Sequence, residues 1–97
     1  MIGEGDILYS SWGKEQTNVD WYRVVSRKDE QVQLQPLTDK VTETGNMCGR
    51  SMPGQPKESL TLQRDIHTSE GVESVEVKPF VFAYKWDGQP KPCSWYG

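Results

Sequence analysis

The chain has 97 residues, of which only 34% are hydrophobic, and it carries a formal net charge of −3 at pH 7. This length fits a single small domain, in which the four Trp, four Tyr and two Phe supply core area that the few aliphatic residues lack. Because no run of Lys and Arg accompanies the acidic balance, the charge pattern argues against a protein that binds nucleic acid through its phosphates.

Targeting signals and cysteines bear on the compartment. No stretch is long and apolar enough to span a bilayer, and residues 1–6 lack the basic region and apolar run of a signal peptide. We therefore expect a cytoplasmic protein. Cys48 and Cys93 are the only cysteines, and without an export signal we expect them to be free thiols.

Residues 21–35 carry the clearest secondary-structure signal, an alternation of apolar and polar residues that predicts strands. Their aromatic and β-branched start, the polar turn over Arg27 to Glu30 and the inward positions Val32 and Leu34 predict a hairpin. No window has the apolar spacing of an amphipathic helix. Weaker alternation, bounded by turn residues, predicts further short strands over residues 5–10, 41–42, 60–66, 72–78 and 80–84.

Pro and Gly interrupt the chain at two further places. They make residues 52–59 a loop, and beyond the hairpin-turn dipeptide Asp87-Gly88 they make residues 87–97 an extended edge or a tail. Six or seven short strands separated by such turns predict one all-β domain over residues 1–97. We expect a small, partly open barrel, SH3-like or similar, with little or no helix.

The segment from Ser10 to Tyr22 stands out as a loop rich in amide and hydroxyl side chains between aromatic residues. Such side chains fold loops by bonding to their own backbone. We expect Trp12 and Trp21 to clamp this loop onto the barrel. A core does not require the polar side chains, so the candidate binding residues are Gln16, Thr17, Asn18 and Asp20, with the aromatic residues Trp12, Trp86 and Trp95.

Catalytic and metal chemistry have little support in the sequence. Cys48, His67 and Cys93 are the only soft ligands, and none forms a Cys-x-x-Cys or His-x-x-x-His pair, so we expect no metal and no cofactor. A Cys–His nucleophile built from the same residues competes with a buried thiol and a surface His. Asp6 and Asp20 flank the unusual segment, but such acids are typical of solvated faces and turn caps. We therefore expect a protein that is not an enzyme.

Three stretches resemble a group of small proteins that phages, plasmids and other bacterial mobile elements encode. The first is Gly-Asp-Ile-Leu-Tyr-Ser-Ser-Trp-Gly over residues 5–13, continued by Gln-Thr-Asn-Val-Asp-Trp-Tyr-Arg-Val-Val over 16–25. The second is Glu-Thr-Gly-Asn-Met-Cys-Gly over 43–49, and the third is the Trp-Asp-Gly-Gln-Pro-Lys ending over 86–96, which closes on Trp-Tyr. The group has no assigned activity, so the resemblance implies a setting.

Small proteins of that setting often bind and block a host component, including CRISPR effectors and other defence proteins. The resemblance therefore implies a non-enzymatic accessory protein that binds and modulates a host protein in the host cytoplasm. Two alternatives stay open. One is a nucleotide or single-stranded nucleic-acid binder that uses the aromatic face and the loop from Gln16 to Asn18. The other is a homodimer formed through an edge strand.

Overall fold

A computed structural model describes residues 2–13, 17–57 and 61–94 of the chain. These residues form strands and no helix, so the predicted all-β class is confirmed. The strands are β1 (Ile7–Trp12), β2 (Asn18–Lys28), β3 (Gln31–Gly45), β4 (Cys48–Pro56), β5 (Leu62–Ser69), β6 (Val72–Lys78), β7 (Val81–Lys85) and β8 (Lys91–Ser94). No helix that could cross a membrane occurs in this part of the chain.

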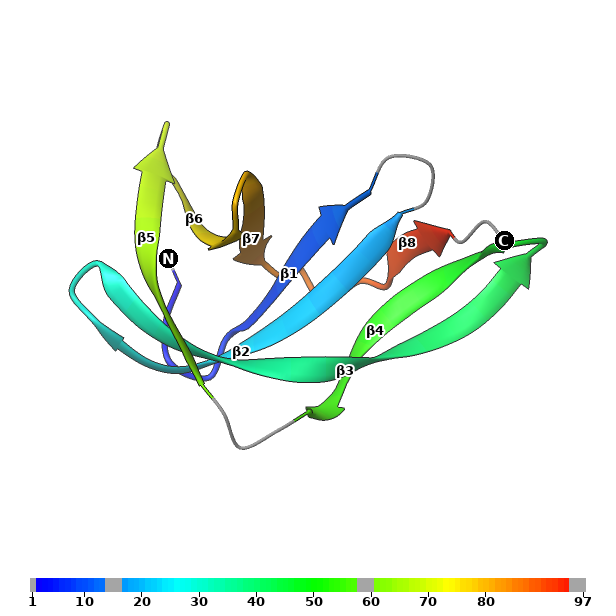
Figure 1. Cartoon of the computed structure of the whole chain (residues 1–97), viewed down its shortest axis with the longest axis horizontal. Coiled ribbons are helices and arrows are strands. Elements are labelled where there is room, and N and C mark those ends of the chain that lie inside the picture. The colour runs from blue at the N-terminus through cyan, green and yellow to red at the C-terminus, as the bar shows by residue number, and fades with distance from the viewer. Residues whose placement is uncertain (1, 14–16, 58–60, 95–97) are drawn as a thin grey trace.

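Six of the strands close into a ring (Figure 1). The sheet order is β2-β1-β7-β6-β5-β3, and an additional β2–β3 pairing joins the two ends of that series. β4 and β8 continue the sheet beyond β3, and every pairing is antiparallel. This arrangement agrees with the predicted small, partly open barrel, and it adds a β3–β4–β8 extension at one side of the ring.

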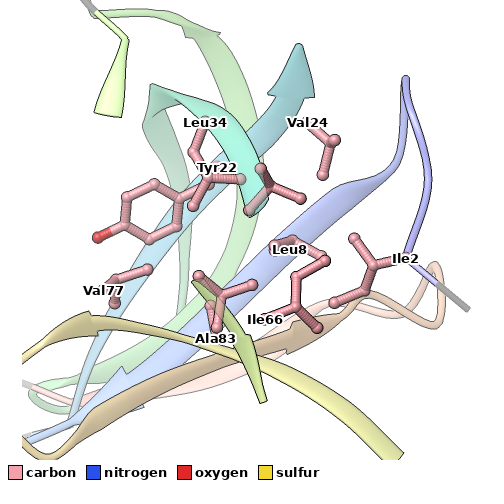
Figure 2. Close-up of a cluster of buried hydrophobic side chains, with 10 residues drawn as sticks. Ile2, Leu8, Tyr22, Val24, Leu34, Ile66, Val77 and Ala83 are labelled. Carbon is pink, nitrogen blue, oxygen red and sulfur yellow. The ribbon is translucent and has the colours of Figure 1, made fainter. Parts of the chain in front are cut away.

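The interior of the ring holds the larger hydrophobic core (Figure 2). Alternate residues of β2, Tyr22 and Val24, point into it, as do the predicted inward positions Val32 and Leu34 of β3. Full burial of an aliphatic or aromatic side chain contributes about 1.5–3 kcal/mol. The buried members are Ile2, Leu8, Tyr22, Val24, Val32, Leu34, Ile66, Val75, Val77 and Ala83.

A second core lies on the opposite face of β2. Val19 and Trp21 point into it and pack with Leu37 of β3 and Cys93 of β8. The partly buried side chains of Ile7, Tyr9 and Trp86 cover this cluster. β2 is therefore buried on both faces. This explains why apolar or aromatic residues occur at both odd and even positions between Val19 and Val24.

The predicted loop over residues 52–59 is wrong for the part that the structure describes. Residues 52–56 belong to β4, where Met52 pairs with Lys40 and Pro56 with Leu37. Among the described residues, β8 pairs only with residues 48–51 of β4. Beyond Ser51 the outer edge of β4 has no partner strand, so a proline whose ring points to that edge removes no hydrogen bond from the sheet. Gly54 does not form a turn but lets β4 lie close to Thr38 of β3, because a Cβ at this position would lie 2.8 Å from the Thr38 carbonyl oxygen.

One turn prediction and one strand boundary also need correction. Asp87-Gly88 does not join paired strands, because β7 pairs with β1 and β6 whereas β8 pairs with β4. The dipeptide lies in a connection that carries the chain from the ring to the extension. The sequence predicts Phe80 as the first residue of a strand, yet it lies in the turn before β7, at a φ of 62°. A proline precedes it, which favours a tight turn over an extended strand.

Candidate binding site

The strands β2 and β3 separate at one point and form a fork. They pair from Lys28 and Gln31 as far as Trp21 and Leu37, and no further. Beyond that pair, residues 18–20 pair only with β1, and residues 39–43 pair only with β4, within the described part of the chain. The fork therefore leaves two strand edges without a strand between them.

A cleft of about 190 Å³ lies in this fork. Trp12, Thr17, Asn18 and Asp20 line it from the β1–β2 hairpin, and Asp39 and Val41 line it from β3. The end of β8, at Cys93 and Ser94, and Lys57 complete its wall. The lining mixes acids, one ammonium group and apolar surface, which suits a peptide-like ligand better than a purely apolar one.

The segment from Ser10 to Tyr22 is mostly strand, not loop. β1 continues to Trp12 and β2 begins at Asn18, and these two residues face each other across the ladder. Gly13 ends β1 at a φ of 128°, which favours glycine and lets the chain leave the strand. A loop over the whole segment is wrong, because Ser10, Ser11, Asn18 and Asp20 occupy strand positions. Thr17 lies just before β2, and residues 14–16 lie outside the described residues.

The structure brings together part of the predicted site. Trp12, Thr17, Asn18 and Asp20 all line the cleft. Trp86 lies elsewhere, packed edge-on against Trp21 with ring centroids 5.3 Å apart, and its indole N–H donates to the Gln89 carbonyl at 2.7 Å. The two remaining predicted residues, Gln16 and Trp95, lie outside the described residues.

Trp12 is held at the rim of the cleft by two charged side chains. Its indole N–H donates to Asp20 Oδ2 at 2.7 Å, and Lys78 Nζ lies 3.1 Å from the same oxygen. Lys78 Nζ also lies 4.5 Å from the centroid of the Trp12 ring, within range of a cation–π contact. The ring stays 38% exposed, so Trp12 is a positioned surface residue rather than the core clamp that the sequence predicted.

Two hydrogen bonds join the start of β2 to β8. The backbone N–H of Thr17 donates to Ser94 Oγ at 2.9 Å, and the N–H of Ser94 donates to the Thr17 carbonyl at 3.1 Å. These bonds close one side of the cleft. No local pattern in the sequence points to Ser94 or Lys78, because each lies more than fifty residues from its partner along the chain.

Two titratable groups near the cleft are kept neutral. Burial raises the pKa of the Cys93 thiol, and the nearby acid Asp39 and the thiol of Cys48 add to the rise. Burial, helped by Asp20, raises the pKa of Tyr22 to about 12, against smaller opposing effects of Ser10 and Arg64. Cys93 is thereby a poor nucleophile, because the reactive form of cysteine is the thiolate.

The residues weighed for catalysis are spread over the molecule. Cys48 pairs with Ser94 and Cys93 with Gly49, so the two thiols project from opposite faces of the β4–β8 ladder. Both are free thiols, as predicted. His67 instead packs edge-on against Phe82 on the ring. Among the described residues, no group of three or more His, Cys, Asp or Glu side chains is placed to hold a metal ion.

The two carboxylates that flank the unusual segment do not meet. Asp20 pairs with Ser10 across β1 and β2, whereas the carbonyl of Asp6 accepts from the N–H of Val24, four residues further along the ladder. The Asp6 carboxylate lies 3.6 Å from Lys85 Nζ. A paired-carboxylate site is therefore not formed.

Phe80 is a feature that the sequence analysis missed. Its side chain is 93% exposed, and its backbone lies in the left-handed region, where a residue without a Cβ is preferred. Its N–H donates to Glu76 Oε2 at 3.2 Å, which fixes the turn. Lys78, which contacts Trp12, pairs with Val81 across this turn and lines a groove together with Phe80 and Arg64.

No protein-family model, no curated protein and no solved structure matches this chain. The inference of function therefore depends on the geometry of the fork and of the turn that carries Phe80.

Proposed function

We propose that this chain is a non-enzymatic accessory protein that binds and modulates a host protein. The observation that carries the proposal is Phe80, an almost fully exposed aromatic side chain at a left-handed backbone position. Within the described residues, no ring or cation contact holds its side chain. The fold itself gains little from a phenyl ring at this position.

The energetics favour a role for Phe80 outside the fold. A residue with a Cβ in the left-handed conformation costs about 1–2 kcal/mol relative to glycine. Burying a phenylalanine against a partner returns about 1.5–3 kcal/mol. Aromatic side chains of this kind are frequent anchors of protein–protein interfaces, where they fill a pocket of the partner. The cost in the free protein is thus offset when the ring is buried in a complex.

The surroundings of Phe80 suit a protein partner better than nucleic acid. Trp12 and Lys78 lie at the neighbouring rim, and aromatic residues are enriched at protein interfaces. The charged side chains that share the groove of Phe80 are Arg64, Glu76 and Lys78, and Lys78 is paired with Asp20. They form no cluster of unpaired cations that would attract a phosphate backbone. We therefore place the nucleic-acid alternative second.

The setting of the proposal comes from the resemblance to proteins of phages, plasmids and other mobile elements. Proteins of that kind act in the host cytoplasm, and a defence component of the CRISPR type is the class of target that the resemblance favours. The residues of the site do not depend on this setting. A host protein with an apolar pocket for Phe80 satisfies the proposal whatever its own activity.

Affinity capture from a bacterial lysate tests the proposal. The wild-type chain is expected to retain a stoichiometric protein, and the Phe80→Gly variant is expected to lose it. Val72→Thr is the matched control. Val72 is also an exposed apolar residue, but it lies at the start of β6 and is only 55% exposed. Recovery of no stoichiometric protein, or equal recovery by Phe80→Gly, would contradict the proposal.

A further inference from the structure

The second half of β3 has one edge to which no strand of the described part of the chain is paired. Residues 39–43 pair with β4 on one side, and within the described ranges no strand pairs with their other side. Every residue from Thr38 to Gly45 is exposed. Such an edge presents a row of backbone N–H and C=O groups that another extended chain can bind.

Neither proline nor lysine blocks the inward face of this edge. Register shifts lie between Leu37 and Asp39 and between Glu43 and Gly45, so they bracket the segment 39–43 but leave it regular. The segment contains no proline. Its only lysine, Lys40, pairs with Met52 and lies on the opposite face from Val41, which pairs with the buried Ser51. The inward face of the edge is therefore not blocked by a lysine.

The inward face of this edge has a distinct charge pattern. Asp39, Val41 and Glu43 alternate as acid, apolar and acid, and no ion pair neutralises either acid within the described residues. Asp20, the other acid of the cleft, is already paired with Lys78. Opposite charges attract when they face each other across an antiparallel pair. The edge therefore favours a strand with basic, apolar and basic residues at alternate positions.

From this pattern we infer that the β3 edge over Asp39–Glu43 binds an extended basic–apolar–basic segment of a partner protein. The inference rests on the proposed function, since it names the chemistry of one segment of the partner. The cleft beside the edge gives the inward side chains of such a segment room next to Val41 and Asp39.

A second copy of this chain fits the edge less well. In a two-fold symmetric antiparallel pair, residues on the same face of the two copies oppose each other. Centring the pair on Val41 places Asp39 opposite Glu43 of the other copy, and centring it on Lys40 or Glu43 places like charges opposite each other. Centring it on Thr42 avoids this repulsion but places Val41 opposite Glu43, so neither acid gains an opposite charge. Like charges directly opposite destabilise a sheet. Charge complementarity thus favours a basic segment over self-pairing.

Titration with two palindromic peptides tests the inference by NMR. The probe is Thr-Lys-Thr-Val-Thr-Lys-Thr, which places Lys opposite Asp39 and Glu43 and Val opposite Val41. The matched control is Thr-Glu-Thr-Val-Thr-Glu-Thr. The Lys peptide is expected to shift the amide resonances of residues 38–45 and to bind about tenfold more tightly than the Glu peptide. The double variant Asp39→Lys/Glu43→Lys is expected to reverse this preference.

A charge control and the Phe80→Gly variant show whether the preference for the Lys peptide comes from this edge, from the net charge of the protein or from Phe80. Glu30→Lys/Asp65→Lys makes the same change in net charge on exposed residues near the start of β3, and it should keep the preference for the Lys peptide. Phe80→Gly should also bind the Lys peptide like the wild type, so this result is independent of the capture experiment. No shift at millimolar peptide, equal affinity for both peptides, or concentration-dependent self-association at this edge would overturn the inference.

Discussion

The indole N–H of Trp21 donates a hydrogen bond of 2.7 Å to the hydroxyl of Ser51, and both side chains are buried. Trp21 belongs to β2 and Ser51 to β4, so this bond joins the ring to the β3–β4–β8 extension. Tyr9 and Trp86 pack against the same indole at 6.1 and 5.3 Å between ring centroids. β2 and β3 separate directly beyond Trp21, so this residue sets where the fork begins.

Replacing Ser51 by alanine should destabilise the protein. The indole N–H of Trp21 would then lie buried without an acceptor, which costs about 1–3 kcal/mol of unfolding free energy. Urea unfolding followed by tryptophan fluorescence measures this change. Ser11→Ala is the control, because Ser11 is exposed on β1. If the two variants unfold at the same urea concentration, this bond does not stabilise the junction between the ring and the extension.

The ion pair between Arg27 and Glu73 should make stability fall in acid. The guanidinium of Arg27 bonds both oxygens of Glu73 at 2.9 Å, and the N–H of Ile2 donates to one of them at 2.7 Å. The bonds from Arg27 first, and then the bond from Ile2, lower the pKa of Glu73 from 4.5 to about 2.

Because the folded pKa of Glu73 is the lower one, its contribution to stability is fully present above the unfolded value of 4.5. This contribution is lost as the pH falls from 4.5 through about 2. Glu73→Gln should flatten the pH dependence of the urea midpoint in that range. An equally steep fall in the Glu73→Gln variant would show that other carboxylates cause the acid sensitivity.

Replacing Phe80 by glycine should leave the protein at least as stable as the wild type. Glycine relieves the left-handed backbone conformation, which favours the variant by about 1–2 kcal/mol, although the larger conformational entropy of glycine in the unfolded chain offsets part of this gain. Little buried contact is lost, because Phe80 is almost fully exposed. Phe82→Gly is the contrasting variant, because Phe82 lies within β7, packs against His67 and is partly buried. The midpoint temperature of thermal unfolding should be much lower for Phe82→Gly than for the wild type and for Phe80→Gly. A large loss of stability in Phe80→Gly would mean that the ring packs against the fold.

The local alternation of apolar and polar residues was enough to predict the hairpin of β2 and β3. Val32 and Leu34 point to the same buried face, so every second residue there must be apolar. Local pattern failed where glycine and proline serve packing instead of turns. Gly54 allows β4 to approach Thr38 closely, and no sequence rule separates that role from a loop. Glycine and proline therefore predict a loop from Met52 onward, although residues 52–56 belong to β4.

The candidate site was predictable only in part for a similar physical reason. Trp12, Thr17, Asn18 and Asp20 lie close together in the sequence and were found by composition. Lys78, which pairs with Asp20, comes from β6 and reaches the site only through closure of the ring. Phe80 carried a weak signal, an aromatic residue directly after a proline, but its exposure depends on where β7 begins.

The affinity of the captured host protein for two variants tests the central claim most directly. Calorimetric titration should give a dissociation constant at least about tenfold weaker for Phe80→Gly than for the wild type, because an aromatic anchor typically contributes 2 kcal/mol or more. Val72→Thr should bind like the wild type. Equal affinity of a correctly folded Phe80→Gly variant would contradict the claim that this protein binds its partner through Phe80.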